Sequence, residues 1–189
     1  MQSLYVTIVE VPRPGRFWLL AEPVGGRPVQ ALGNVVVKAR TSAPAAGAKA
    51  IASRTPTIAS TGGDFARLTT AVPPDRELLR YSVAETLAAR KAFVLVFATP
   101  KFCSSRTCGP VVDVVDHVRR GTRSADVRFI HVEIYRDNDP KKGVNRWVEE
   151  WGLPSEPWVF VVGRDGRIEA RFEGSVSVPE LEGALRRVE

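Results

Sequence analysis

Residues 93–116 read FVLVFATPKFCSSRTCGPVVDVVD, and this stretch places both cysteines of the chain, Cys103 and Cys108, between a strand and a helix. The apolar run over residues 93–98 is typical of a strand that is buried on both faces. After Pro110, valines recur at the spacing of one face of a helix. We therefore expect both sulfurs to lie in a strand-to-helix turn.

A disulfide between these cysteines would exclude a regular helix between them. Helical residues five positions apart are separated by about 7.5 Å along the axis and point about 140° away from each other, which exceeds the usual limits of disulfide geometry. For the oxidised pair we expect a loop from Cys103 to Thr107 and a helix that starts at Cys108 or Gly109.

The rest of the C-terminal half alternates helices and strands around this turn. Ser82 and Ser177 are each followed three residues later by a glutamate, a pattern that predicts capped helix starts. The expected elements are, in order, a helix from Ser82, the strand from Phe93, the helix after Pro110, a strand over 127–135, a helix capped by Asp139 and Pro140 and closed by Gly152, a hairpin of strands 158–162 and 167–172, and a last helix from Ser177.

The N-terminal part has a different character. Residues 1–40 predict a small antiparallel β-module, with strands over 4–11, 16–22 and 29–38 and with Trp18 in its core, such as the end of a β-sandwich domain. Residues 41–74 are rich in Ala, Ser, Thr, Pro and Gly, which is typical of an extended linker or of a segment that wraps a surface. The predicted domains are therefore 1–40 and 75–189, joined by 41–74.

The chain has 189 residues and a net charge of +6, with 44% hydrophobic and 25% charged residues, which are values of a globular protein. The basic residues are scattered, so we expect no nucleic-acid partner. No apolar segment approaches the roughly 20 residues that cross a bilayer, so we expect no integral membrane segment. No signal peptide is visible, although an extracytoplasmic or membrane-anchored parent is compatible with a fragment.

From Ser82 onward, the order helix, strand, helix, strand, helix, hairpin, helix resembles the thioredoxin fold. FVLVFATPKFC (93–103) is similar to the strand that leads to the active-site cysteine in thiol-disulfide proteins of the TlpA and redoxin type. WGLPSEPWVFVVGRDGRI (151–168) is similar to the segment of that group in which a proline precedes the third strand and a glycine-containing hairpin follows it. The resemblance covers about residues 75–189.

The resemblance implies an α/β, thioredoxin-like fold, with a central mixed sheet flanked by helices and preceded here by the small antiparallel β-module. It also implies a disulfide oxidoreductase that acts on protein thiols and disulfides and needs no cofactor. Pro157 matches the proline that is cis in that family and lies beside the cysteines, where it shapes the groove for the partner's backbone.

The cysteine motif departs from that of the family. Its usual pattern is Trp-Cys-x-x-Cys, whereas here Phe102 precedes Cys103 and four residues separate the pair. A second alignment puts Cys108 in the position of the first cysteine and Val111 in that of the second. The strand length and Pro100 favour Cys103 as the leading cysteine.

The chemistry follows from the reactivity of thiolates. Amides at a helix N-terminus, together with Lys101 and Arg106, would lower the pKa of a cysteine in the turn. Cys103 would then attack the disulfide of a partner, and Cys108 would resolve the mixed disulfide.

Three other interpretations remain open. A structural disulfide in a catalytically inactive interaction module is one, although so short a loop would contribute only about 2 kcal/mol. A copper-binding chaperone would use Cys103, Cys108 and His131 as ligands. Peroxidase chemistry of the peroxiredoxin type would need a threonine or serine where Pro100 stands.

Overall fold

The computed structural model describes residues 9–22, 24–25, 31–103 and 106–188. The chain divides into two compact units, Met1–Thr41 and Ser42–Glu189. Each unit is described here by itself. Among the described residues, no helix combines the length and the apolar character that crossing a membrane requires.

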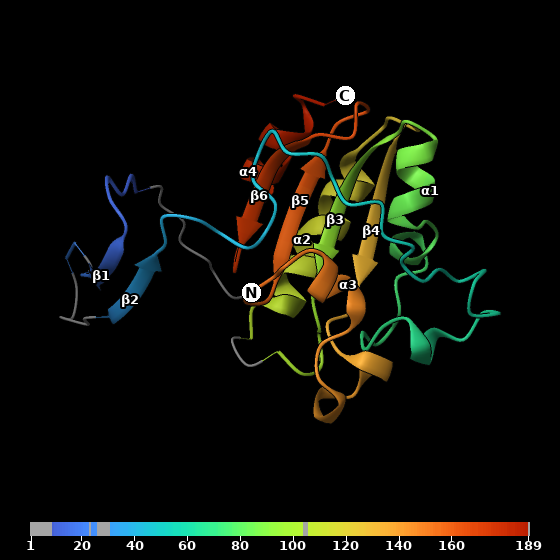
Figure 1. The fold of residues 1–189 in the computed structure, drawn as a ribbon, viewed down its shortest axis with the longest axis horizontal. Helices are drawn as coiled ribbons and strands as arrows, with labels where there is room; N and C mark the ends of the chain where they lie inside the picture. The colour runs from blue at the N-terminus through green and yellow to red at the C-terminus, as the bar shows by residue number, and fades with distance from the viewer. Residues whose placement is uncertain (1–8, 23, 26–30, 104–105, 189) are drawn as a thin grey trace. The chain divides into compact units, whose positions relative to one another are not determined.

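The larger unit is built on a four-stranded mixed sheet in the order β4-β3-β5-β6 (Figure 1). Its central strand β3 is parallel to β4 and antiparallel to β5, and β5 is antiparallel to β6. The strands are β3 (Ala92–Phe97), β4 (Val127–Val132), β5 (Trp158–Val162) and β6 (Ile168–Glu173). This strand order and these directions are those of the thioredoxin fold, so the predicted fold class is confirmed.

The helices are α1 (Val83–Ala88), α2 (Cys108–Gly121), α3 (Arg146–Glu150) and α4 (Val178–Leu185). Three of the four helices, α1, α2 and α4, begin close to the positions that the sequence predicts. Ser82 and Ser177 both form the expected capping boxes, with Glu85 and Glu180. Short 3₁₀ turns lie at Phe65–Arg67, Glu77–Leu79, Arg136–Asn138 and Pro140–Lys142.

The predicted start of the third helix is wrong. Asp139 caps only the 3₁₀ turn Pro140–Lys142, and Gly143 then interrupts the helical path with a φ of 75°. The side chain of Asn145 accepts hydrogen bonds from the backbone amides of Trp147 and Val148 and so begins α3. The left-handed conformation of Gly143 is the physical reason that one predicted helix becomes two short ones.

Both faces of the sheet are buried, as the unbroken apolar sequence of β3 predicts. Because side chains alternate along a strand, Val94 and Val96 pack toward α2 and α4, while Phe93, Leu95 and Phe97 pack toward the opposite face. On that second face lie Val83 of α1 and Trp151, which follows α3. Figure 1 shows α2 behind the sheet and the segment after residue 42 crossing its front.

The sequence predicts residues 41–74 as a linker or a surface-wrapping segment, and the first part of this segment, over residues 43–53, packs on this second face. Its residue Ala43 is 3% exposed, and the Gly47 amide donates a hydrogen bond of 2.7 Å to the Ile168 carbonyl oxygen. The indole Nε1 of buried Trp151 donates to Ser53 Oγ at 3.1 Å. Small side chains allow this backbone to approach the sheet closely. The segment thereby covers part of this face of the sheet, as a helix does elsewhere.

The smaller unit contains an antiparallel pair, β1 (Gly15–Ala21) and β2 (Ala31–Val37). Of the predicted strand over 4–11, residues 4–8 lie outside the described residues and residues 9–11 form no strand. Residues 29–30 of the predicted third strand also lie outside the described residues. The prediction of Trp18 as a core residue is wrong, because the residue is 65% exposed. A two-stranded sheet has no second layer against which to bury an aromatic side chain.

Candidate functional site

The two cysteines lie where β3 gives way to α2. Cys108 is the first residue of α2 and is fully buried, while Cys103 is partly buried in the preceding loop. Both are free thiols, and the Cys108 backbone amide donates a hydrogen bond of 3.3 Å to Cys103 Sγ. Helix α2 begins at Cys108, where the helix of the oxidised pair is expected to begin, although the two cysteines are not bridged in this structure. Residues 104–105 of the predicted loop lie outside the described residues.

A turn brings Cys103 back over the start of the helix. The Arg106 amide donates to the Cys103 carbonyl oxygen at 3.3 Å, and Arg106 itself has a positive φ of 59°. This left-handed residue breaks the helical path that would otherwise hold the sulfurs apart. Cys103 Sγ therefore accepts a hydrogen bond from an amide at the helix N-terminus, which favours a thiolate over a thiol.

The two basic residues next to the pair are placed differently from each other. The Lys101 ammonium lies 5.3 Å from the centroid of the Phe102 ring, above its face. Arg106 is exposed to solvent. Their effect on the reactivity of Cys103 stays a prediction.

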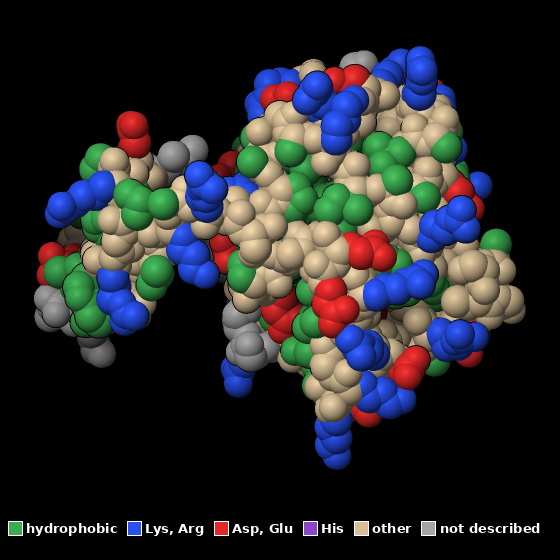
Figure 2. Space-filling view, viewed as in Figure 1, with side chains coloured by type: hydrophobic (Ala, Val, Ile, Leu, Met, Phe, Trp, Pro, Cys, Tyr) green, Lys and Arg blue, Asp and Glu red, His purple; other side chains and the backbone are tan. Residues whose placement is uncertain are grey.

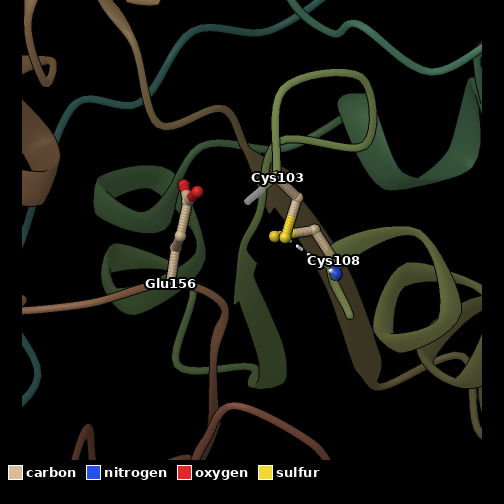
Figure 3. A group of neighbouring side chains, drawn as sticks. All are labelled: Cys103, Cys108 and Glu156. Carbon is tan, nitrogen blue, oxygen red and sulfur yellow. Dashed lines mark hydrogen bonds between the residues drawn. The ribbon is translucent and has the colours of Figure 1, made fainter. Parts of the chain in front are cut away.

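A third acidic side chain joins the cysteines. Cys103 Sγ, Cys108 Sγ and a carboxylate oxygen of Glu156 all lie within 4.8 Å of one another. Figure 3 shows the three side chains converging, with Glu156 rising from the loop that precedes β5. Glu156 is partly buried, and its Oε2 atom is shielded from solvent. The site is thus a cluster of three acidic groups at the end of the sheet.

Glu156 immediately precedes Pro157, and the peptide bond between them is cis. Pro157 is buried, as is Trp158, which begins β5. Glu156 is not among the site residues that the sequence predicts. Its position in the sequence is the signal that could have identified it. The resemblance places Pro157 beside the cysteines, and Glu156 directly precedes Pro157.

Tyr135 completes this environment. The sequence predicts a strand through residue 135, but β4 ends at Val132, and the chain then leaves the sheet. Burial raises the pKa of the Tyr135 phenol, and the charges of Glu156, Cys108 and Cys103 raise it further. A hydrogen-bond contribution from Glu156 also raises this pKa, so Tyr135 lies near the carboxylate.

Cys108 is held as a neutral thiol. Burial raises its pKa well above the ordinary value, the hydrogen bond with Cys103 raises it further, and the negative charges of Cys103 and Glu156 add smaller effects. A backbone hydrogen bond from Thr99 acts in the opposite direction and is outweighed. At neutral pH, a base must therefore remove the Cys108 proton before this sulfur can react.

The raised pKa of Cys108 makes stability depend on pH. A thiol that resists ionisation in the folded state stabilises the protein fully below the ordinary pKa of 9.0, and this contribution is lost as the pH rises above that value. We expect the free energy of unfolding of the reduced protein, relative to that of Cys108→Ala, to fall by up to about 1.4 kcal/mol per pH unit above that point. Urea unfolding of both proteins across this range measures the difference, and a difference that is independent of pH would contradict the burial of the thiol.

His131, the proposed third copper ligand, lies on β4 and is 4% exposed. Its Nε2 atom is 3.0 Å from the carbonyl oxygen of Ala98, just after β3. The side chain that lies with the two sulfurs as a potential third metal ligand is Glu156, whereas the copper hypothesis assigns this role to His131.

A groove of about 620 Å³ lies beside the turn. It runs between residues 71–77 and α2, and Pro100 and Gly109 line it. Gly109 directly follows Cys108 in the chain. The groove therefore opens close to the start of α2.

No protein-family model and no curated protein sequence matches the chain. Among solved structures, a thiol:disulfide interchange protein of the thioredoxin family from Chlorobium tepidum TLS is 14% identical, and the match covers 57% of this chain and 85% of that one with a TM-score of 0.42. The oxidised C-terminal domain of DsbD from Neisseria meningitidis is 22% identical over 56% and 91% of the two chains, with a TM-score of 0.40. The exposed lipoprotein thioredoxin Etrx1 from Streptococcus pneumoniae TIGR4 is 16% identical over 53% and 89%, with a TM-score of 0.38. These are distant similarities, and the fold follows from the strand order of the chain itself.

Proposed function

We propose that the chain is a thiol-disulfide oxidoreductase that exchanges electrons with protein disulfides through Cys103 and Cys108. The observation that carries this proposal is the hydrogen bond from the Cys108 amide to Cys103 Sγ, which holds a partly accessible sulfur beside a buried one. The two sulfur atoms lie within 4.8 Å of each other, and a disulfide requires them to approach to about 2 Å. The redox pair is favoured over a structural disulfide because the core of the larger unit is extensive without a bond between these cysteines.

In the first step, the Cys103 thiolate attacks one sulfur of a partner's disulfide. A mixed disulfide forms between Cys103 and that sulfur, and the other sulfur leaves as a thiolate. Cys103 takes this role because its sulfur is the less buried of the two and accepts the amide hydrogen bond. Pro157 and the adjacent loop shape the surface against which the partner's backbone lies, as the family resemblance implies.

In the second step, Cys108 transfers its proton to Glu156 and attacks Cys103 Sγ. The new bond is the Cys103–Cys108 disulfide, and the partner leaves as a second thiolate. The partner gains two electrons, and the pair loses two. The same steps run in reverse when the oxidised protein meets a partner dithiol.

A trapping experiment tests this order of events. Reduced Cys108→Ala protein, mixed with insulin as a model disulfide substrate, is expected to accumulate one mixed disulfide per chain, because the second step is blocked. The matched variant Cys103→Ala is expected to accumulate none. Mass spectrometry of non-reduced samples measures both.

Two outcomes would count against the proposal. If neither variant is trapped, the chain does not attack protein disulfides. If only Cys103→Ala is trapped, Cys108 leads the reaction, as in the second alignment of the motif.

On the face of the larger unit that Figure 2 shows, the distribution of charged side chains does not indicate a surface for nucleic acid. Lys and Arg side chains there are interspersed with Asp and Glu instead of forming one continuous basic surface. An electrostatic footprint for nucleic acid would need such a surface.

A further inference from the structure

The cluster of Cys103, Cys108 and Glu156 has a second chemical capacity. It brings two sulfur atoms and one carboxylate oxygen within 4.8 Å of one another in a site that is half-buried. Thiolate and carboxylate groups are both ligands of zinc in proteins. Three acidic groups close together also repel one another when ionised, and a bound dication would remove that repulsion.

We propose that the reduced protein binds one Zn²⁺ ion through Cys103 Sγ, Cys108 Sγ and the carboxylate of Glu156. The oxidised protein cannot bind the ion in this way, because both sulfurs are then joined in a disulfide. Oxidation of the pair therefore removes the zinc site, and reduction restores it.

The spacing of the ligand atoms fits this ion. In a tetrahedral site with Zn–S distances of about 2.3 Å, two thiolate sulfurs lie about 3.8 Å apart, and a sulfur and a carboxylate oxygen lie slightly closer. The observed upper limit of 4.8 Å means that two ligand atoms need to approach each other by about 1 Å for the sulfur pair and by about 1.3 Å for a sulfur and the carboxylate oxygen, at most. Rotation about the side-chain bonds of Glu156 can supply much of this movement.

The surroundings of the ligands also fit a metal site. Tyr135 lies near Glu156, whose charge raises the pKa of the Tyr135 phenol, and is placed to act as an outer partner of this ligand. The Cys108 amide donates to Cys103 Sγ, which orients that sulfur in the same way. Three protein ligands leave a fourth tetrahedral position for water.

The mixed character of the ligand set favours zinc over softer or harder ions. Soft thiolates alone select Cu(I) as well as Zn²⁺, whereas carboxylates alone suit Mg²⁺, Ca²⁺ and Mn²⁺. A set of two thiolates and one carboxylate is best matched by an ion of intermediate softness. This distinguishes the proposed site from the copper hypothesis, in which the third ligand was His131.

Zinc binding would protect the pair from oxidation until a strong enough disulfide oxidant arrives. When such an oxidant, for example oxidised glutathione, takes two electrons from the two thiolates, it also takes up two protons and becomes two thiols. The products on the protein are the Cys103–Cys108 disulfide and a released Zn²⁺ ion. Binding itself is no redox step, since each neutral thiol only loses a proton to the solvent.

The test is a zinc titration of the chemically reduced full chain, without oxygen and against a chromophoric chelator. We expect one Zn²⁺ per chain, an affinity that is weaker by about tenfold to a hundredfold in Glu156→Gln, and no binding to the oxidised protein. Glu10→Gln, a change at an exposed glutamate of the smaller unit, is expected to match the parent. Glu156→Asp, which keeps a carboxylate, is expected to lie between the parent and Glu156→Gln.

Equal affinity of the parent and a folded Glu156→Gln variant would overturn the proposal, because binding would then depend on the thiols alone. Equal binding by reduced and oxidised protein would overturn it as well. Electron exchange is assayed separately with metal-free protein. Failure of zinc binding in an active protein refutes only this inference, and zinc binding by an inactive protein refutes only the proposed function.

Discussion

Replacing Cys103 by serine is expected to lower the rate of protein-disulfide reduction to the uncatalysed background, a loss on the order of a thousandfold or more. Serine keeps nearly the same shape but has no thiolate at neutral pH, so the first attack cannot occur. The buried Cys108 does not replace it, because burial and its neighbours raise the pKa of that thiol. Insulin reduction by a small dithiol, with and without the variant, measures the effect.

Cys108→Ser is the matched control for this prediction. Without a small dithiol, it is expected to release one thiolate per chain in a rapid first phase and then to stop, because Cys103 can still attack and no second thiol is present to resolve the adduct. Comparable thermal unfolding of the two variants would show that both are folded. Full activity in Cys103→Ser would contradict the assignment of Cys103 as the nucleophile.

Replacing Glu156 by glutamine is expected to slow the resolving step by about a hundredfold at neutral pH. Two effects of this change oppose each other. The variant loses the base nearest to the Cys108 proton, which slows the attack, but it also loses a negative charge that disfavours the Cys108 thiolate. Loss of the base should dominate, because burial and the Cys103 hydrogen bond raise the pKa of Cys108 more than the Glu156 charge does.

The resolving step can be measured by itself. A mixed disulfide between Cys103 and thionitrobenzoate is prepared, and the release of the coloured thiolate reports the attack by Cys108. In Glu156→Gln the rate is expected to rise with pH, as hydroxide replaces the missing base, and Glu156→Asp is expected to recover part of the parent's rate. A faster release in Glu156→Gln than in the parent would show that the carboxylate acts only through its charge.

The sequence predicts the strand-to-helix turn well because several local signals agree there. The apolar run of β3, the proline in the first turn of α2 and the valine periodicity each favour the same structure, and none depends on distant contacts. The capping boxes at Ser82 and Ser177 are local in the same way. Signals of this kind place Cys103 and Cys108 correctly relative to each other.

The features that the sequence does not reveal depend on tertiary contacts or on single backbone angles. Glu156 reaches the cysteines because β5 lies next to β3, which brings the loop before β5 to the end of the sheet. Tyr135 joins the site because the chain leaves the sheet after Val132. Trp18 lies in an apolar stretch that predicts a core strand, but among the described residues only β2 pairs with its strand, and the side chain is exposed.

The central claim is that Cys103 and Cys108 form a reversible two-electron couple. Incubation of the full chain in glutathione buffers of graded potential, followed by acid quenching, alkylation and mass spectrometry, counts the thiols and identifies the bond. We expect both thiols to disappear together with one midpoint, as an intramolecular Cys103–Cys108 disulfide that reduction reverses. Thiols that persist at every potential, or a Cys103 adduct with glutathione that never converts to the intramolecular bond, would contradict it.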